Sequence, residues 1–342
     1  MRNSTSPGGA ILWALAILLA ILSPLVLSSI YWTSALTRIL IFVLMAVSLR
    51  TVYLVGELSL GHVGFMCIGA YTSALLSMKA GLPFALNLTA GGLMAGLVAF
   101  SLGYPFMRVK GIYFAILTVV TSESFRLLAF NWKSLTGGTD GLIGFPGAGS
   151  LFIPAIGRID FGGFNEYYYL TLTVVCASLY ILQRLERSRL GFIWLAIRET
   201  DKMAGAVGVN VLKFKVVNFT VACFFAGIGG GLLAHAEQAL SPMDGATFSV
   251  MTTIYLLVYM VVGGKEKFEG PIVGTVVLSL VSEFTRPVEV YQPMIIGAIA
   301  IAVVMLLPHG LAGLPQKFGL WLPPVRIGNM ETDLESKTER ST

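Results

Sequence analysis

The run ALAILLAILSPLVLSSI, residues 14–30, and the run AIAIAVVMLL, residues 298–307, are continuously apolar. Such runs predict membrane-crossing helices, because a helix of about 20 apolar residues spans the hydrocarbon core of a bilayer. A transmembrane barrel would instead show segments of about ten residues that alternate in polarity. Of the 342 residues, 56% are hydrophobic and 12% are charged, which is about half the charged fraction of an ordinary soluble domain. The chain is therefore predicted to be all-α, a polytopic transmembrane helical bundle.

Apolar runs of this kind predict about ten spans. They are 10–30, 36–55, 59–78, 86–106, 111–130, 167–183, 216–236, 247–263, 270–285 and 291–308. The first is interpreted as a span and not as a signal peptide, because it is longer than a typical apolar signal region and lacks a convincing small-residue cleavage site.

The basic residues predict the orientation. If both ends of the chain lie in the cytoplasm, 17 basic residues face inside and six face outside. In a membrane chain this distribution is more informative than the net charge of +5, which is therefore not interpreted as a sign of nucleic-acid binding. Because Lys and Arg are enriched in cytoplasmic loops, the N and C termini are predicted to be cytoplasmic. The six outer residues are Arg38, Lys79, Arg126, Lys133, Arg158 and Arg286.

Two connections are longer than a hairpin needs, and they are predicted to lie on opposite sides. The outer loop, 131–166, is rich in Gly and Pro, and the inner loop, 184–215, is basic and contains the helix-favouring stretch IWLAIRETDKMAGAVG. A short helix at the cytoplasmic surface is expected there. The chain thus divides into a transmembrane domain, 1–322, and a polar tail, 323–342, predicted to be disordered and cytoplasmic.

Motifs for catalysis, metal binding or nucleotide binding are missing from the sequence. It contains no G-x-x-x-x-G-K-[ST], HExxH, CxxC or G-x-S-x-G pattern, and Cys67, Cys176 and Cys223 are too widely spaced for a metal cluster. No catalytic residue, no metal and no cofactor of the chain itself is expected. If ATP drives the protein, another polypeptide binds it.

Small and ionisable residues inside the spans have two interpretations each. The glycines of SLGHVGFMCIGAY, residues 59–71, and those of Gly227 to Gly231 favour close helix packing, the alternative being a broken helix that lines a pathway. His62 is expected to bond to a neighbouring helix, with a pathway role as the alternative.

Two similar charged pairs occur near the outer ends of predicted spans. Glu123 and Arg126 lie in SESFR, and Glu283 and Arg286 lie in SEFTR, three residues apart in each case. Each pair is expected to be either an interfacial ion pair or part of an outer rim of a vestibule.

Four motifs appear in order over most of the chain: GELSLGHVGFMCIGAYTSALL; VKGIYFAILTVVTSESFR with LTGGTDGL; RSRLGFIWLAIRETDKMAGAVGVNVLKFKVVNFTVACFFAGIGGGL; and VVGGKEKFEGPIVGT with LLPHGLAGL. With them the chain resembles the membrane permeases of branched-chain amino-acid ABC importers, the LivM type, over residues 36 to 315. The resemblance implies half of a translocation pathway in the bacterial inner membrane. It also implies a second permease of the LivH type, two cytoplasmic ATP-binding subunits that hold the ATP, and a periplasmic substrate-binding protein.

The resemblance further implies that the inner loop holds the helix that couples to the ATPases. In ABC importers this helix often carries the signature E-A-A, then three residues, then G. When that glycine is aligned with Gly208, the E-A-A positions fall on Lys202, Met203 and Ala204, and only Ala204 matches. The predicted coupling residues are Arg198, Glu199, Asp201, Lys202, Met203, Ala204 and Gly208. The charged loop at 265–269 is interpreted as solvated, with extra ATPase contacts as the alternative.

The solute implied by the resemblance is an amino acid, which can cross as a zwitterion against hydroxyls and backbone groups. The predicted pathway residues are Ser59, His62, Tyr71, Tyr113, Thr118 and Thr121. Similar permeases carry urea, short amides or aromatic acids, so these solutes remain alternatives. Two other classes of protein also remain alternatives: an ion-driven secondary transporter and a non-transporting subunit of a membrane complex.

Overall fold

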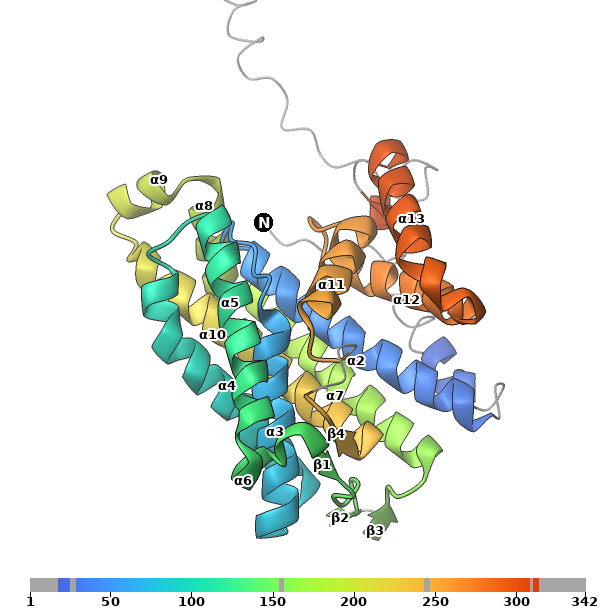
Figure 1. The fold of residues 1–342 in the computed structure, drawn as a ribbon. Coiled ribbons are helices and arrows are strands. Elements are labelled where there is room, and N and C mark those ends of the chain that lie inside the picture. The colour runs from blue at the N-terminus through green and yellow to red at the C-terminus, as the bar shows by residue number, and fades with distance from the viewer. Residues whose placement is uncertain (1–17, 25–28, 154–156, 243–246, 308–309, 314–342) are drawn as a thin grey trace, which may run out of the picture.

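The structure is a computed structural model that describes residues 18–24, 29–153, 157–242, 247–307 and 310–313. It is a bundle of helices (Figure 1). The predicted tail, 323–342, lies outside the described residues, and so does most of the first predicted span, 10–30, of which residues 18–24 are helical.

Seven of the described helices are long and apolar enough to cross a membrane. They are α2 (Ile30–Tyr53), α3 (His62–Ala80), α4 (Phe84–Phe106), α5 (Ile112–Asn131), α7 (Phe164–Glu186), α10 (Val211–Glu237) and the segment Gln292–Gly313, which contains α13 (Gln292–Leu306). The helices α11 (Val250–Gly263) and α12 (Glu269–Phe284) are shorter, with 14 and 16 residues. The protein is thus a helical membrane protein, and the number of ten spans stays a prediction.

Short elements connect the long helices. The inner connection contains α8 (Arg189–Glu199) and α9 (Asp201–Ala206), and the outer one contains α6 (Lys133–Thr136), η1 (Gly138–Asp140), β1 (Leu142–Ile143), β2 (Ser150–Ile153) and β3 (Gly157–Asp160). Strand β1 pairs antiparallel with β4 (Ala239–Leu240), and β2 pairs antiparallel with β3. The remaining turns are η2 (Arg286–Tyr291) and η3 (Leu311–Gly313).

Helix α10 is the centre of the bundle and packs against α2, α3 and α4. Its glycines let the backbones approach closely: a Cβ added at Gly230 would lie 1.9 Å from the carbonyl oxygen of Met66, and one at Gly69 would lie 2.2 Å from that of Gly227. Helices in lipid associate through such close packing, because burying apolar side chains there gains little. Of the two interpretations of these glycines, the packing face is the one that the structure shows.

The two long connections lie at opposite ends of the bundle (Figure 1). Helix α9 ends shortly before α10 begins, and β4 begins shortly after α10 ends. Since α10 has 27 residues, about 40 Å of helix separates the two ends. Helices α11 and α12 pack against each other and against α2, beside this core, and α13 contacts both of them.

Candidate functional site

The inner connection begins with two helices that meet at an angle, α8 and α9, which together we call the elbow. Helix α8 begins after Ser188, whose side-chain oxygen accepts a hydrogen bond from the backbone N–H of Leu190 at 3.2 Å. Such a cap satisfies one of the free N–H groups of the first turn. Thr200 then adopts extended backbone angles (φ −158°, ψ 105°), which ends α8 and sets α9 at a new angle.

The elbow packs on the inner end of α2. Trp194 and Ile197 of α8 and Ala204 of α9 form a small apolar cluster with Leu54 and Val55, separate from the main core. The indole N–H of Trp194 also donates to the backbone carbonyl of Phe214 in α10, at 3.1 Å. The inward face of the elbow is therefore fixed to the bundle by burial.

Arg50 joins three segments at this end of the bundle. Its side chain is 1% exposed, and its two Nη atoms reach the two carboxylate oxygens of Glu186 at 2.7 and 2.9 Å. It also donates to the backbone carbonyls of Lys265 and Glu266, at 2.9 and 3.0 Å. A buried guanidinium is tolerated only when its donors are satisfied in this way. Arg50 thereby ties α2 to the last turn of α7 and to the α11–α12 loop.

Arg198 of the elbow extends this network. Its Nη2 contacts Glu266 Oε1 at 2.7 Å and the hydroxyl of Tyr53 at 3.0 Å, and its guanidinium lies 4.3 Å from the Tyr53 ring centroid. We call the set Arg50, Tyr53, Glu186, Arg198 and Glu266 the Arg50 cluster. Glu266, in the 265–269 loop that is interpreted as solvated, is 57% exposed and also holds this loop against α8 through Arg198.

A second set of charges fixes α9. Lys215 and Glu57 form an ion pair at 3.0 Å in which both side chains are 4% exposed, and Lys215 also reaches Asp201 at 3.3 Å. Asp201 contacts Lys110 as well, and the second Glu57 oxygen accepts from the backbone N–H of Gly111 at 3.2 Å. These four side chains, Glu57, Lys110, Asp201 and Lys215, form the Lys215 cluster, which connects α9, α10, the α2–α3 connection and the α4–α5 loop.

The clusters shift the pKa values of three of their members, Arg198, Glu266 and Asp201, toward the charged form. The hydrogen bond from Arg198 lowers the pKa of Glu266, and that bond in turn raises the pKa of Arg198. Burial acts to raise the pKa of Asp201, but hydrogen bonds and positive charge from Lys110 and Lys215 outweigh it, so its pKa lies below the ordinary value. The charged forms of Arg198, Glu266 and Asp201 are thus favoured where they attach the elbow.

The outward face of the elbow is different in character. Met203 is 73% exposed and Val207 is 80% exposed, and the side chains of Glu199 and Lys202 are exposed beside them. Gly208 closes the segment with φ +87°, and a Cβ built there would meet open space. Two large apolar side chains are therefore exposed at the tip of a charged segment.

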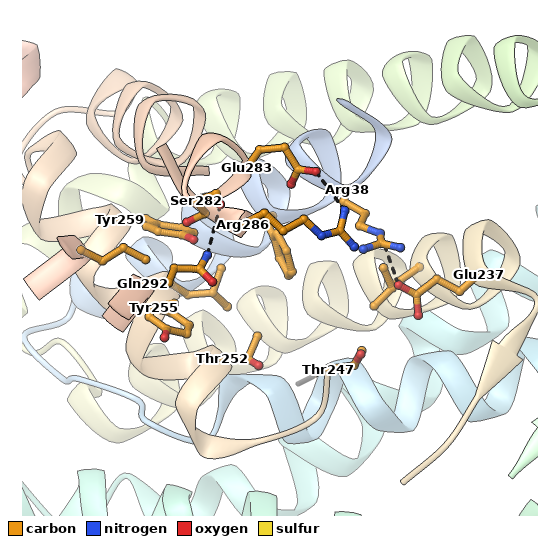
Figure 2. A pocket seen from close by; sticks show the side chains of 14 residues that line it. Arg38, Glu237, Thr247, Thr252, Tyr255, Tyr259, Ser282, Glu283, Arg286 and Gln292 are labelled. Carbon is orange, nitrogen blue, oxygen red and sulfur yellow. Dashed lines mark hydrogen bonds and ion pairs between the residues drawn. The ribbon is translucent and has the colours of Figure 1, made fainter. Parts of the chain in front are cut away.

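The described part of the chain contains a cavity of about 360 Å³ on the opposite half of the molecule (Figure 2). It lies between α2, α10, α11, α12 and α13. The ion pair of Arg38 and Glu237, at 3.6 Å, lies at one side of it, together with Glu283 and Arg286. Figure 2 shows the four charged ends gathered there, with Thr252, Tyr255 and Gln292 facing them across the cavity. Arg38 is the ninth residue of α2, because that helix begins at Ile30 and not at residue 36 as the hydropathy pattern predicts.

Residues 31–304 match the model of the family described as branched-chain amino acid transport system / permease component. The chain belongs to this permease family. LivM, the high-affinity branched-chain amino acid transport system permease protein of Escherichia coli K12, is 30% identical over 299 residues, which cover 80% of this chain and 68% of LivM. LivH of Salmonella typhi is 22% identical over 80% of this chain and 92% of LivH. The guanosine ABC transporter permease protein NupQ of Bacillus subtilis is 26% identical over 52% of this chain and 59% of NupQ.

No solved structure matches the chain. With these relatives, the chain is a permease subunit of an ABC importer, a multi-pass membrane component of a family whose members are not enzymes.

The predicted pathway residues of this permease are only partly brought together. His62 is fully buried and bonds to Ser48 of α2 at 2.8 Å, as expected for a histidine between helices. Thr118 of α5 packs near the start of α3, where its hydroxyl accepts from the backbone N–H of Leu60 at 3.1 Å. Ser59 is fully buried, and its hydroxyl has no hydrogen-bond partner among the described residues. These three therefore surround the start of α3.

The other three pathway residues lie elsewhere. Tyr71 is buried farther along α3, beside Phe248. Thr121 is half-buried and bonds to the backbone of its own helix at Leu117, and Tyr113 is 71% exposed. The structure gives Tyr113 no place in a common lining with the rest.

The predicted outer rim divides in two. Glu283 and Arg286 line the cavity, whereas Glu123 and Arg126 are not part of its lining, and Arg126 instead donates to the backbone carbonyl of Pro242 at 2.9 Å. The sequence reasoning missed Arg38 and Glu237 at this place, as well as Arg50, Glu57 and Lys215 at the inner end. The available signal was an ionisable residue inside or at the end of an apolar span, which by itself does not name a partner.

Proposed function

We propose that this permease forms half of a translocation pathway for branched-chain or related amino acids in the bacterial inner membrane. The LivM relatives, whose names give that solute class, match it at 30% identity over 80% of its length. On this proposal the other half is a second permease of the LivH type. A periplasmic substrate-binding protein delivers the solute to the side of loop 131–166, and two cytoplasmic ATP-binding subunits act at the elbow.

The elbow carries the coupling in this proposal. The single observation behind it is that the Arg50 cluster and the Lys215 cluster connect two short helices to several separate segments at one end of the bundle. A displacement of α8 and α9 therefore moves the ends of α2, α7 and α10 together with the α4–α5 and α11–α12 loops. Rigid-body movement of this kind converts a local push into a change between inward-open and outward-open states.

The contact surface for the ATPase is the outward face of the elbow. Met203 and Val207 supply apolar area there, and Glu199 and Lys202 supply charge at its edge. Arg198, Asp201 and Ala204 face the bundle and transmit the movement, and Gly208 ends the segment. Of the seven coupling residues, then, some bind the partner and others hold the elbow.

The pathway in this proposal begins near the cavity and passes the start of α3, where Ser59, His62 and Thr118 present polar atoms in an apolar surrounding. Urea, short amides, aromatic acids and, from the NupQ relative, guanosine are the rival solutes. The LivM match extends over more of the chain than the NupQ match, which favours amino acids.

Substitution of Met203 tests the coupling role. Met203→Glu, combined with Val207→Glu, places two charges at an apolar contact without touching the core, because both side chains are more than 70% exposed. Uptake of radiolabelled leucine by cells is expected to fall about tenfold or more, the equivalent of about 1.4 kcal/mol of lost contact. The matched control is Met203→Leu, which keeps the apolar surface and is expected to keep uptake.

Two further measurements separate the alternatives. The amount of protein in the membrane must be equal for the three proteins, and unchanged uptake by the double variant would contradict the coupling role. Purification through a tag on this chain is expected to recover two ATPase subunits and a second permease. Uptake that an uncoupler abolishes but that persists without ATP would favour an ion-driven transporter instead.

A further inference from the structure

The cavity beside α2 contains a charged residue where a membrane helix rarely has one. Arg38 lies eight residues after the first residue of α2, which is about 12 Å along the helix axis. An ionisable side chain within an apolar span is costly, and such residues commonly mark a binding site or a pathway. Arg38 reaches Glu237 at 3.6 Å, which is longer than a charge-assisted hydrogen bond, and its side chain is 52% exposed.

The second cation of the cavity is held in a similar way. Arg286 lies 3.3 Å from Glu283 and donates to the hydroxyl of Tyr31 at 3.0 Å, while its side chain is 57% exposed. Glu283 also accepts a hydrogen bond from Tyr31. A guanidinium offers five N–H donors in a planar fork, so both arginines have the capacity to bind a carboxylate in addition to their present partners.

The charges of the cavity are balanced. Two guanidinium groups and two carboxylates lie at one side, so an anion alone or a cation alone would leave the site with a net charge. A molecule that carries both charges at short distance can replace both ion pairs and leave the site neutral. The rest of the lining is partly apolar, with Phe42, Leu256 and Ile296.

We propose that this cavity binds a small zwitterion of the α-amino-acid kind, with an apolar side chain, on its way through the permease. The carboxylate of the ligand binds between Arg38 and Arg286, its ammonium group binds Glu283 and Glu237, and its apolar side chain lies against Phe42, Leu256 and Ile296. The volume of about 360 Å³ falls in the range of ordinary ligand sites. This inference rests on the proposed function and gives it a location.

A cysteine at the cavity wall tests the site with all four charges intact. Ser282 lines the cavity, and Ser282→Cys is labelled with a small methanethiosulfonate in membrane vesicles that carry the chain with its native partner subunits. L-leucine is expected to slow the labelling. Leucinamide, which lacks the carboxylate, and 4-methylpentanoate, which lacks the ammonium group, are expected to require at least tenfold higher concentrations. Labelling of the chain without the new cysteine gives the background from the native cysteines.

Charge variants in the same background identify the groups. Arg38→Gln and Glu283→Gln are expected to raise the protecting leucine concentration at least tenfold. The matched control is Arg126→Gln, since Arg126 belongs to a similar charged pair that is not part of this cavity. Equal protection by leucine, leucinamide and 4-methylpentanoate, or no protection by any of them, would overturn the inference. This comparison of ligands uses only the Ser282→Cys protein, so it does not depend on the folding of a charge variant.

ATP-driven leucine uptake by the Ser282→Cys protein, measured in parallel, separates this inference from the proposed function. Intact uptake without protection overturns the cavity site and leaves the function standing. Absence of ATP-driven leucine uptake by the unaltered complex overturns the proposed function, and the protection experiment then reports on the cavity alone.

Discussion

At the scale of single residues, the inner end of this permease depends on two buried cations. Arg50 is 1% exposed and is satisfied by one carboxylate and two backbone carbonyls, whereas Lys215 is 3% exposed and is satisfied by two carboxylates. The free-energy cost of desolvating such a charge is offset only while its partners are present. Removing one partner leaves a buried charge without compensation, which costs more than the pair contributes.

Lys215→Met is therefore expected to be strongly destabilising, because it leaves Glu57 buried beside Asp201 without its cation. The expected loss is about 3 to 5 kcal/mol of unfolding free energy. Thermal unfolding of the purified permease in detergent measures it. Lys110→Met removes a cation of the same cluster that is 65% exposed and should lower the midpoint far less. Equal unfolding midpoints for the two variants would show that the buried Lys215–Glu57 pair contributes no more to stability than the exposed Lys110 does.

The attachment of the elbow is expected to be insensitive to pH until the medium is strongly acidic. Glu266 and Asp201 have pKa values below their ordinary 4.5 and 3.8, so their ion pairs contribute full stability above those values. That contribution is lost as the pH falls through the lowered pKa values. Hydrogen exchange of α8 and α9, corrected for the intrinsic rate, should be constant from about pH 7 to about pH 5 and should rise below about pH 4. Faster exchange already at pH 6 would point to a histidine or to another group.

At the scale of elements, the helix contacts around α10 are set by residues without side chains. The backbone of α10 touches that of α3 at Gly230 and Gly227, so these two helices are held by contacts that no larger residue permits. The functional consequence is a stiff core of α2, α3, α4 and α10. On the proposed coupling, motion driven by the elbow is expected between this core and the neighbouring α11, α12 and α13, where the cavity lies.

Two glycine substitutions separate packing from helix propensity. Gly230→Ala brings a Cβ to 1.9 Å from the Met66 carbonyl oxygen and is expected to destabilise by about 1 to 3 kcal/mol or more through overpacking. Gly297→Ala in α13 meets nothing within 4 Å and should stabilise by roughly 0.5 to 1 kcal/mol, because alanine favours a helix. Denaturant or thermal unfolding in the same detergent compares them. A stable Gly230→Ala protein would contradict the close approach of α3 and α10.

At the scale of the whole molecule, the elbow and the outer loop lie at opposite ends of the bundle, about 40 Å apart along α10. This arrangement is what an importer requires, since ATP is used on one side and solute is received on the other. Seven helices have the length and composition of a span. The two shorter helices, α11 and α12, line the cavity, and the loop that joins them contacts Arg50.

The predicted orientation is tested with reporter fusions. Alkaline phosphatase inserted after Gly149, in loop 131–166, should be active, because it would lie in the periplasm. Green fluorescent protein fused after residue 342 should be fluorescent, because that end is predicted to be cytoplasmic. An inactive phosphatase together with a dark C-terminal fusion would invert the topology and would move the elbow away from any cytoplasmic ATPase.

Some of the inner network had a signal in the sequence and some had none. Arg198, Asp201 and Lys202 stand out as charges in a helix-favouring inner loop, and the resemblance to known permeases marked that loop. Glu57 and Lys215, by contrast, are 158 residues apart, and nothing local links them. The cavity shows the same division: Glu283 and Arg286 are a visible pair three residues apart, but Arg38 and Glu237 meet only because α2 and α10 pack side by side.

Hydropathy and contiguous motifs were enough to predict a bundle of membrane helices, the positions of most of those helices and the family. These properties follow from hydropathy, which acts over about 20 consecutive residues, and from motifs that are contiguous in the chain. Only the tertiary structure decided which charges pair, that the 265–269 loop holds the elbow, and that four charges share one cavity. Pairing depends on the packing of helices distant in sequence, because a buried charge is stabilised by whatever lies within a few ångströms and not by its neighbours in the chain.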